Sequence, residues 1–205
     1  MLSVVIATEN AERTLVPTLA ALVPGAMAGV VREVIVADAG SSDATAMIAD
    51  AAGCRIDVTH APLGERLRQA AARARAAWLL FLRPGAVPDS TWTDEARRFI
   101  EQTERGGREG ARAAAFRSTV EADTLSAVIM QALALIATAL GGKPQHQGLL
   151  ISKTLYERSG GHPGDDADPE GKFLRQLGRR RIVLLRSRAL MAAPPPFPPP
   201  PAGEG

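Results

Sequence analysis

The chain has little of several features that would assign a protein quickly to a class. Only one of its 205 residues is cysteine, Cys54, which excludes an intramolecular disulfide. No Cys-x-x-Cys or Cys/His spacing offers thiolate ligands to a metal, so we expect a reducing compartment. Aromatic residues make up 4% of the chain and the formal net charge is only +2. A nucleic-acid-binding surface, which needs basic side chains interleaved with stacking rings, therefore has no compositional support.

Long apolar segments are also scarce. The N-terminal sequence MLSVVIATENAER has no basic segment and soon becomes acidic, unlike a signal peptide, so we expect a cytoplasmic protein. The uncharged apolar stretch 124–140 has 17 residues, short of the roughly 20 that a membrane-spanning helix needs. We expect a core or interfacial helix there, and peripheral contact with a membrane surface through 124–140 stays open as an alternative.

The first hundred residues alternate between short apolar runs and longer helical patterns. Several of the runs are apolar at every position, as in strands buried on both faces of a parallel sheet. The alternation predicts an α/β, Rossmann-like sheet. In the helix at 65–77 the alanines are expected to pack on the sheet and the arginines to face water. The predicted strands are 3–7, 33–37, 55–59, 78–82 and 111–120, and the predicted helices are 11–22, 44–52 and 65–77.

The loops that follow the predicted parallel strands are the places to look for a site, because right-handed crossovers put ligands beyond the carboxyl ends of the strands. The segment EVIVADAGSSDAT is the most informative of them. Asp38 ends a strand, Gly40 permits a tight turn, and a helix begins directly afterwards. A carboxylate in this place can accept hydrogen bonds from a nucleotide. The alternative is that Asp38 and Asp43 only cap a turn and a helix.

Four segments occur in the order found in family 2 glycosyltransferases of the GT-A fold. They resemble that family's opening strand and loop, its Asp-Gly-Ser-x-Asp turn, its apolar strand before a metal motif, and its Gly-Gly-Phe segment. The resemblance is nearest to the short soluble branch and implies a single GT-A domain over 1–190, with a mostly parallel sheet and helices on both faces. The proline-rich stretch 191–205 is expected to be a disordered tail. The segments are SVVIATENAERTL, EVIVADAGSSDAT, APLGERLRQAAARARAAWLLFL and QGLLISKTLYERSGGHP.

The chain departs from this family where the strand at 78–82 ends. The resemblance implies Asp-x-Asp at this place, whose carboxylates hold a divalent metal on the diphosphate of the nucleotide sugar. The sequence instead has Arg83-Pro84-Gly85, with Asp89 as an imperfect substitute. One interpretation is that the guanidinium of Arg83 replaces the metal. The other is that the site has decayed and Arg83 is an ordinary loop residue.

The second half of the chain is expected to supply the base. The resemblance places the family's catalytic acidic segment at 165–168, with Asp166 as the first choice and Asp165 beside it. An inverting transfer needs such a carboxylate to take the proton of the acceptor hydroxyl. The alternative is a solvated acidic loop that caps the helix at 172–177. His146 and His162 are expected to be solvated loop residues without a role.

Together these features predict a glycosyltransferase-like protein. The resemblance implies a nucleotide-sugar pocket over Thr8, Glu9, Asp38 and Gly40, with Arg83 beside them, and transfer with inversion to an unknown acceptor. Because Asp-x-Asp is absent after the strand at 78–82, we expect no divalent metal cofactor. An inactive pseudo-glycosyltransferase that binds a nucleotide or a partner is the alternative. A different Rossmann-like nucleotide enzyme is a weaker one, because neither GxxxxGK[ST] nor GxGxxG occurs.

Overall fold

The computed structural model describes residues 1–119, 146–164 and 166–192, which form a single α/β domain around an eight-stranded sheet. The predicted fold class is confirmed. The predictions for 124–140, for Asp165 and for the tail from 193 onward lie outside the described residues. The strands are β1 (Leu2–Thr8), β2 (Val31–Asp38), β3 (Arg55–Val58), β4 (Trp78–Leu82), β5 (Ala86–Pro88), β6 (Ala113–Thr119), β7 (His146–Ser152) and β8 (Ile182–Met191).

The sheet has the order β3-β2-β1-β4-β7-β6-β8-β5. Its first four strands are mutually parallel, as the β/α alternation predicts. Beyond β4 the sheet is mixed, because β7 runs antiparallel to both β4 and β6, β8 is parallel to β6, and β5 is antiparallel to β8. In the described residues no helix is long and apolar enough to cross a membrane.

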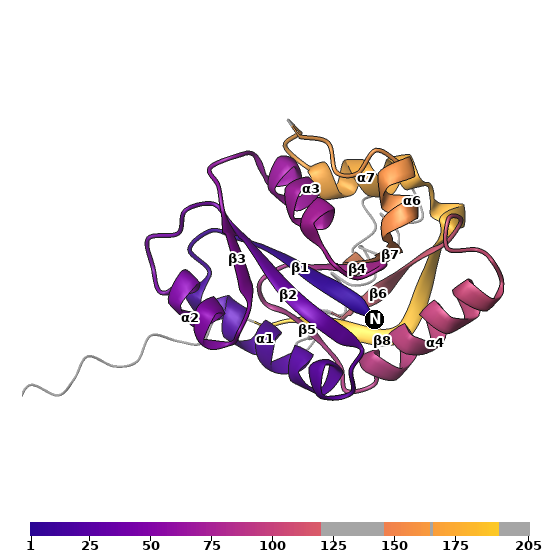
Figure 1. Cartoon of the computed structure of the whole chain (residues 1–205), viewed down its shortest axis with the longest axis horizontal. Coiled ribbons are helices and arrows are strands. Elements are labelled where there is room, and N and C mark those ends of the chain that lie inside the picture. The colour runs from indigo at the N-terminus through magenta and orange to yellow at the C-terminus, as the bar shows by residue number, and fades with distance from the viewer. Residues whose placement is uncertain (120–145, 165, 193–205) are drawn as a thin grey trace, which may run out of the picture.

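Helices cover both faces of the sheet, as Figure 1 shows, with α3, α6 and α7 on one face and α1, α2 and α4 on the other. Successive side chains of a strand point to opposite faces, so Val4 and Ile6 enter one core and Val5 enters the other. The helices are α1 (Glu12–Met27), α2 (Thr45–Ala51), α3 (Leu63–Arg73), α4 (Trp92–Arg105), α6 (Lys153–Arg158) and α7 (Pro169–Leu177), with a 3₁₀ turn η1 at Arg179–Arg181.

Two helix ends differ from the sequence prediction because tertiary contacts decide them. Helix α1 continues to Met27, past Pro24. Its last turn packs on α4 so closely that a Cβ at Gly25 would lie 2.6 Å from Cζ2 of Trp92. Helix α3 ends at Arg73, where Ala74 turns extended. The Nζ of Lys153 donates to the carbonyls of Ala72 and Ala74 at 2.8 and 3.0 Å, which satisfies groups that a helix end leaves unpaired.

The connection between β4 and β5 requires the sheet to curl. Strand β4 is fourth in the sheet and β5 is eighth, yet only residues 83–85 join them. In a flat sheet four strand spacings would separate the two by about 19 Å, whereas the chain from Leu82 to Ala86 reaches at most about 14 Å. The curl therefore brings the far edge of the sheet back to the carboxyl end of β4. There the carbonyl of Gly85 accepts from the N–H of Ala192 at 2.8 Å.

Candidate functional site

The carboxyl ends of β1 and β2 form a compact polar edge centred on Asp38. Thr8 and Asp38 are register partners, and the Thr8 hydroxyl donates to Oδ1 of Asp38 at 2.6 Å. The same carboxylate accepts from the N–H groups of Gly40 and Ser41 and from the Ser41 hydroxyl at 2.6–2.9 Å. Burial raises the pKa of Asp38, but these hydrogen bonds outweigh burial and hold the pKa below its ordinary value. Asp38 is thus an ionised carboxylate that shapes the loop after β2.

The loops after β1 and β2 are fastened to each other. The Oδ1 of Asn10 accepts from the N–H of Ser42, and the N–H of Asn10 donates to Oγ of Ser41, both at 2.9 Å. Gly40 has a φ of 93°, and a Cβ there would lie 2.3 Å from Cε1 of His60. Only glycine suits both the backbone angle and this close approach. The structure therefore brings Thr8, Asp38 and Gly40 together, as the sequence predicts, with Glu9 exposed beside them.

Arg66 on α3 lies beneath this edge, which corrects the expectation that the arginines of α3 face water. It is 6% exposed, and its Nη1 donates to the carbonyls of Thr8 and Ala37, both at 2.8 Å. Burial lowers the pKa of Arg66, while the negative charges of Glu9 and Asp38 favour its charged form. Its Nε has no hydrogen-bond partner within the described parts of the chain. Arg66 ties the ends of β1 and β2 to α3.

Residues 83–85, Arg-Pro-Gly, form a turn at the end of β4. The N–H of Ala86 donates to the carbonyl of Arg83 at 3.0 Å, and Gly85 has a φ of 89°. Proline in the second position and a glycine with positive φ in the third are typical of a type II turn. The N–H of Gly85 also donates to the Thr14 carbonyl and the Thr18 hydroxyl of α1, each at 2.9 Å. Proline and glycine therefore serve the turn, and the side chain of Arg83 is left to project from it.

The side chain of Arg83 forms an ion pair with Glu170 in the first turn of α7. Both Nε and Nη2 of the guanidinium contact Oε2 of the carboxylate. This hydrogen bond raises the pKa of Arg83 further above its ordinary value, against the opposing effect of burial. The side chains of Arg83 and Glu170 are 60% and 21% exposed. Arg83 is thus held toward α7, on the opposite side of β4 from the turn's attachment to α1.

A cavity of about 30 Å³ lies under this ion pair. Its buried wall includes Phe81, Leu149 and His162, and Arg83 and Glu170 form its solvent-facing side. The volume corresponds to that of about one water molecule. Sequence reasoning does not single out Glu170, which lies in this lining although Asp166 was the expected carboxylate.

His162 is buried, contrary to the expectation of a solvated loop residue. It is 1% exposed and packs among the rings of Phe81, Tyr156 and Phe173. Its Nδ1 lies 2.9 Å from the Tyr156 hydroxyl, which also accepts from the His162 N–H at 3.2 Å. Burial lowers the pKa of His162 to about 3 and raises that of Tyr156 to about 12. Both side chains are therefore neutral at physiological pH.

The acidic loop before α7 is organised around Asp166 and Asp168. Asp168 caps α7, since its Oδ1 accepts from the N–H of Gly171 at 3.1 Å. Oδ1 of Asp166 accepts from the N–H of Asp168, and Oδ2 pairs with Nζ of Lys172, both at 2.9 Å. The hydrogen bond from Lys172 is the main reason that the pKa of Asp166 lies below its ordinary value. The capping role weighed for this loop is confirmed for Asp168.

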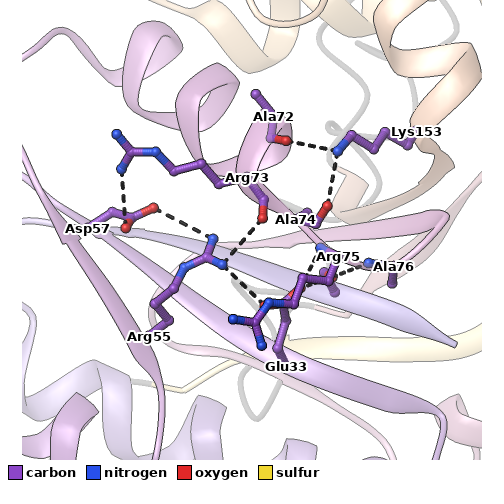
Figure 2. A network of polar contacts seen from close by, with 10 residues as sticks. Glu33, Arg55, Asp57, Ala72, Arg73, Ala74, Arg75, Ala76 and Lys153 are labelled. Atoms are coloured by element: carbon purple, nitrogen blue, oxygen red, sulfur yellow. Dashed lines mark hydrogen bonds and ion pairs between the residues drawn. The ribbon is translucent and has the colours of Figure 1, made fainter.

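The amino ends of the parallel strands carry a separate network of charged side chains, shown in Figure 2. Glu33 accepts from the Ser3 hydroxyl and the Arg75 N–H, both at 2.6 Å, and from Nη1 of Arg55 at 3.3 Å. Asp57 pairs with both Arg55 and Arg73 at 3.7 and 3.3 Å. This network joins β1, β2, β3 and the end of α3. Glu33 and its register partner Ser3 lie at the opposite end of the strands from Asp38, and Asp57 extends the network along β3 to the register of Ala37.

Comparison with known proteins rests on structure, because no family model and no curated protein matches the chain. S. aureus TarS 1–349 aligns with a TM-score of 0.66 at 16% identity, over 93% of this chain. Glucosyl-3-phosphoglycerate synthase from Mycobacterium tuberculosis, in complex with phosphoglyceric acid, aligns with a TM-score of 0.66 at 20% identity, over 97% of this chain. The fold is GT-A.

Sequence identities this low support the GT-A fold but no assignment of activity or substrate. The chain spans 60% of the length of TarS 1–349 and 73% of that of the mycobacterial synthase. Structures of these two glycosyltransferases include complexes of TarS with UDP-GlcNAc and of the synthase with Mn2+ and UDP. A bound nucleotide therefore occurs in structures of both neighbours.

The residues at the end of β4 do not fit the divalent cation that this fold family implies. Arg83 places a positive charge there, and Glu170 is engaged with it. Asp89, the substitute considered from the sequence, accepts from the N–H groups of Thr91 and Arg188 at 2.9 and 2.7 Å. Across 1–119, 146–164 and 166–192, no group of three or more His, Cys, Asp or Glu residues is arranged to hold a metal.

Proposed function

We propose that this chain binds a nucleotide sugar along the carboxyl ends of β1, β2 and β4 and transfers the sugar, with inversion, to an acceptor hydroxyl. The GT-A fold supports the proposal, since TarS was solved with UDP and with UDP-GlcNAc. The edge made by Thr8, Glu9, Asp38 and Gly40 would take the nucleoside. Arg83, at the end of the neighbouring strand β4, would take the diphosphate.

The observation that carries the proposal is the position of Arg83. A type II turn fixes its backbone at the end of β4, and its guanidinium lies at the mouth of the cavity. A guanidinium is a permanent cation whose paired N–H donors match the oxygens of a phosphate. It would offset the charge that grows on the leaving diphosphate as the bond to the anomeric carbon breaks. We therefore propose that binding needs no divalent metal.

The acceptor hydroxyl must lose its proton as its oxygen attacks the anomeric carbon from the face opposite the diphosphate. Asp166, with its neighbour Asp165, is the proposed base. The pKa of Asp166 is held below its ordinary value, so the carboxylate is ionised and able to accept a proton at neutral pH. A low pKa also makes it a weak base, and Lys172 has to move from Oδ2 before that oxygen can take the proton.

A binding module without turnover is the second candidate, and one observation favours it. The carboxylates that chemistry would need are already engaged within the described residues: Asp38 with Thr8 and Ser41, Asp166 with Lys172, and Glu170 with Arg83. Release of an isotope-labelled sugar from UDP-glucose or UDP-GlcNAc, to water or to a mixture of acceptors, would separate the enzyme from the binding module.

Calorimetric titration with UDP tests the binding that both candidates share. We expect the wild type to bind UDP in EDTA as well as in manganese. Arg83→Ala should weaken binding by about ten- to a hundredfold, the scale of a charged bidentate contact. Arg83→Lys should recover part of the loss, because an ammonium lacks the planar fork. Arg105→Ala, which removes an exposed arginine from α4, should leave the affinity unchanged.

Each contrary result has its own meaning. Binding that disappears in EDTA would overturn the metal-independent site. Unchanged affinity in Arg83→Ala would show that residues 83–85 form a turn without a role in nucleotide binding. If the wild type does not bind UDP at millimolar concentration, the nucleotide site itself is wrong.

A further inference from the structure

We propose that the Arg83–Glu170 ion pair is an autoinhibitory contact: Glu170 occupies the anion position on Arg83, and a nucleoside diphosphate binds there by displacing the Glu170 carboxylate. The inference deepens the proposed function and rests on it, since it takes Arg83 as the group that binds the diphosphate.

The geometry of the pair makes the competition direct. Nε and Nη2 of Arg83 both contact one carboxylate oxygen, Oε2 of Glu170. These two N–H groups lie on the edge of the guanidinium that a phosphate or a carboxylate engages side-on. The guanidinium cannot offer the same edge to a phosphate oxygen while Glu170 holds it. The two anions therefore exclude each other on this face of Arg83.

The cavity below the pair is small, and the ion pair forms its solvent-facing side. Its volume of about 30 Å³ leaves room for about one water molecule, which is too little for a phosphate with its substituents. Phe81 and His162 in its lining are 4% and 1% exposed, whereas Arg83 is 60% exposed. The ion pair is the exposed part of this lining and can move without unpacking Phe81 or His162. Release of Glu170 from Arg83 would therefore widen the cavity at its solvent-facing side.

The first turn of α7 holds Glu170 in place without locking its side chain. Asp168 caps the helix and Pro169 follows at its first position, where proline is well tolerated. A carboxylate in the first turn of a helix is favoured by the helix dipole. Because the side chain has three rotatable torsions, it can leave the guanidinium while the backbone of α7 stays in place.

The size of the effect follows from the exposure of the pair. Partly exposed ion pairs contribute little net free energy, so displacing Glu170 should reduce the observed affinity only modestly. Removing the carboxylate should tighten binding by about fivefold. This factor corresponds to the upper end of the free energies measured for exposed ion pairs.

The test is calorimetric titration with UDP in EDTA. Glu170→Gln, which keeps the shape and removes the charge, should bind UDP about fivefold more tightly than the wild type, and Glu170→Ala should do the same. The double variant Arg83→Ala with Glu170→Gln should bind UDP no more tightly than Arg83→Ala alone, because the guanidinium that Glu170 occupies is absent from both. Glu101→Gln is the matched control: it removes a carboxylate that pairs with an arginine on α4 and should not change the affinity.

Two outcomes would overturn this inference alone, and a third would overturn the proposed function with it. Equal or weaker binding by both Glu170 variants, with unchanged melting temperatures, would show that Glu170 does not compete. A gain that persists in the double variant would mean that the effect does not act through Arg83. If UDP binds the wild type and Arg83→Ala weakens it, yet neither Glu170 variant gains affinity, this inference fails and the proposed function stands. If no variant binds UDP at millimolar concentration, both fail.

Discussion

The two ends of the parallel strands use the same kinds of side chain for different purposes. At the amino end, Glu33 is 12% exposed and accepts three hydrogen bonds, from Ser3, Arg75 and Arg55. At the carboxyl end, Glu170 contacts the single guanidinium of Arg83 above a small cavity. A carboxylate with several partners on adjacent strands stabilises the fold. A carboxylate with one exposed partner on a distant element can be exchanged for another anion.

Replacement of Glu33 and of Glu170 should show the largest difference in stability between the two ends. Glu33→Ala is expected to lower the free energy of unfolding by about 2 kcal/mol, because the buried Ser3 hydroxyl and the Arg75 N–H lose their acceptor, while Arg55 keeps Asp57 as a partner. Glu170→Ala should lower it by less than about 1 kcal/mol. Urea denaturation of both variants measures the difference. Equal losses would mean that the ion pair on α7 is as structural as the network at the amino end.

The pH dependence of stability should separate His162 from the carboxylates Glu33 and Asp38. Burial keeps the folded pKa of His162 at about 3, below its ordinary value of 6.5. Below about pH 6.5 the imidazole is therefore protonated in the unfolded chain but not in the folded chain. The free energy of unfolding should fall by about 1.4 kcal/mol for each pH unit below that value. The folded pKa values of Glu33 and Asp38 are also lowered, so their contribution is complete above their unfolded values of 4.5 and 3.8 and is lost only below them.

Urea denaturation between pH 8 and pH 3.5 would check this order. His162→Asn should remove most of the slope between pH 6.5 and 4.5, and Glu33→Gln should reduce only the slope below about pH 4.5. A wild-type stability that is flat from pH 6.5 to 4.5 would contradict the burial of a neutral His162.

Replacement of Asp38 should lower both stability and UDP affinity. Asp38→Ala should lower the free energy of unfolding by about 1.5 kcal/mol and weaken UDP binding by about tenfold, since the loop of Gly40 and Ser41 loses its common acceptor. Asp50→Ala, which removes an exposed carboxylate from α2, is the matched control and should change neither value. Normal UDP affinity in a folded Asp38→Ala variant would place the nucleotide elsewhere.

The β/α half of the fold could be predicted from the sequence because its signals are local. The strand predicted at 78–82 has the bounds of β4. Its continuous apolar run identifies it as a strand buried on both faces, and the Arg-Pro-Gly turn marks its end. The neighbourhood of Thr8 and Asp38 also follows from the sequence, because two parallel strands that end together put their last residues side by side. The roles proposed for these residues in binding a nucleotide remain predictions.

The partners of Arg83 could not be predicted in the same way. Glu170 reaches Arg83 because β7 pairs with β4 and brings the following helices beside it, a contact across 87 residues with no local pattern. A signal did exist for Arg66: it lies between Leu63 and Leu67 and four residues before Ala70, on the apolar face of α3, where a charged side chain needs buried partners. His162 gave no such signal, because the rings around it come from β4, α6 and α7.

The curl of the sheet also sets an order of events during folding. The ladder between β5 and β8 pairs residues 86–88 with 189–191, some hundred residues later in the chain. Contacts of such long range are slow to form, because closing the large loop costs entropy before the contact stabilises it. The turn that carries Arg83 is attached to Ala192 at the end of that last strand. On a ribosome, the first four strands can pair and the turn of Arg83 can attach to α1 while β8 is still unsynthesised, but the bond from Ala192 and the ladder with β5 form only after β8 has emerged.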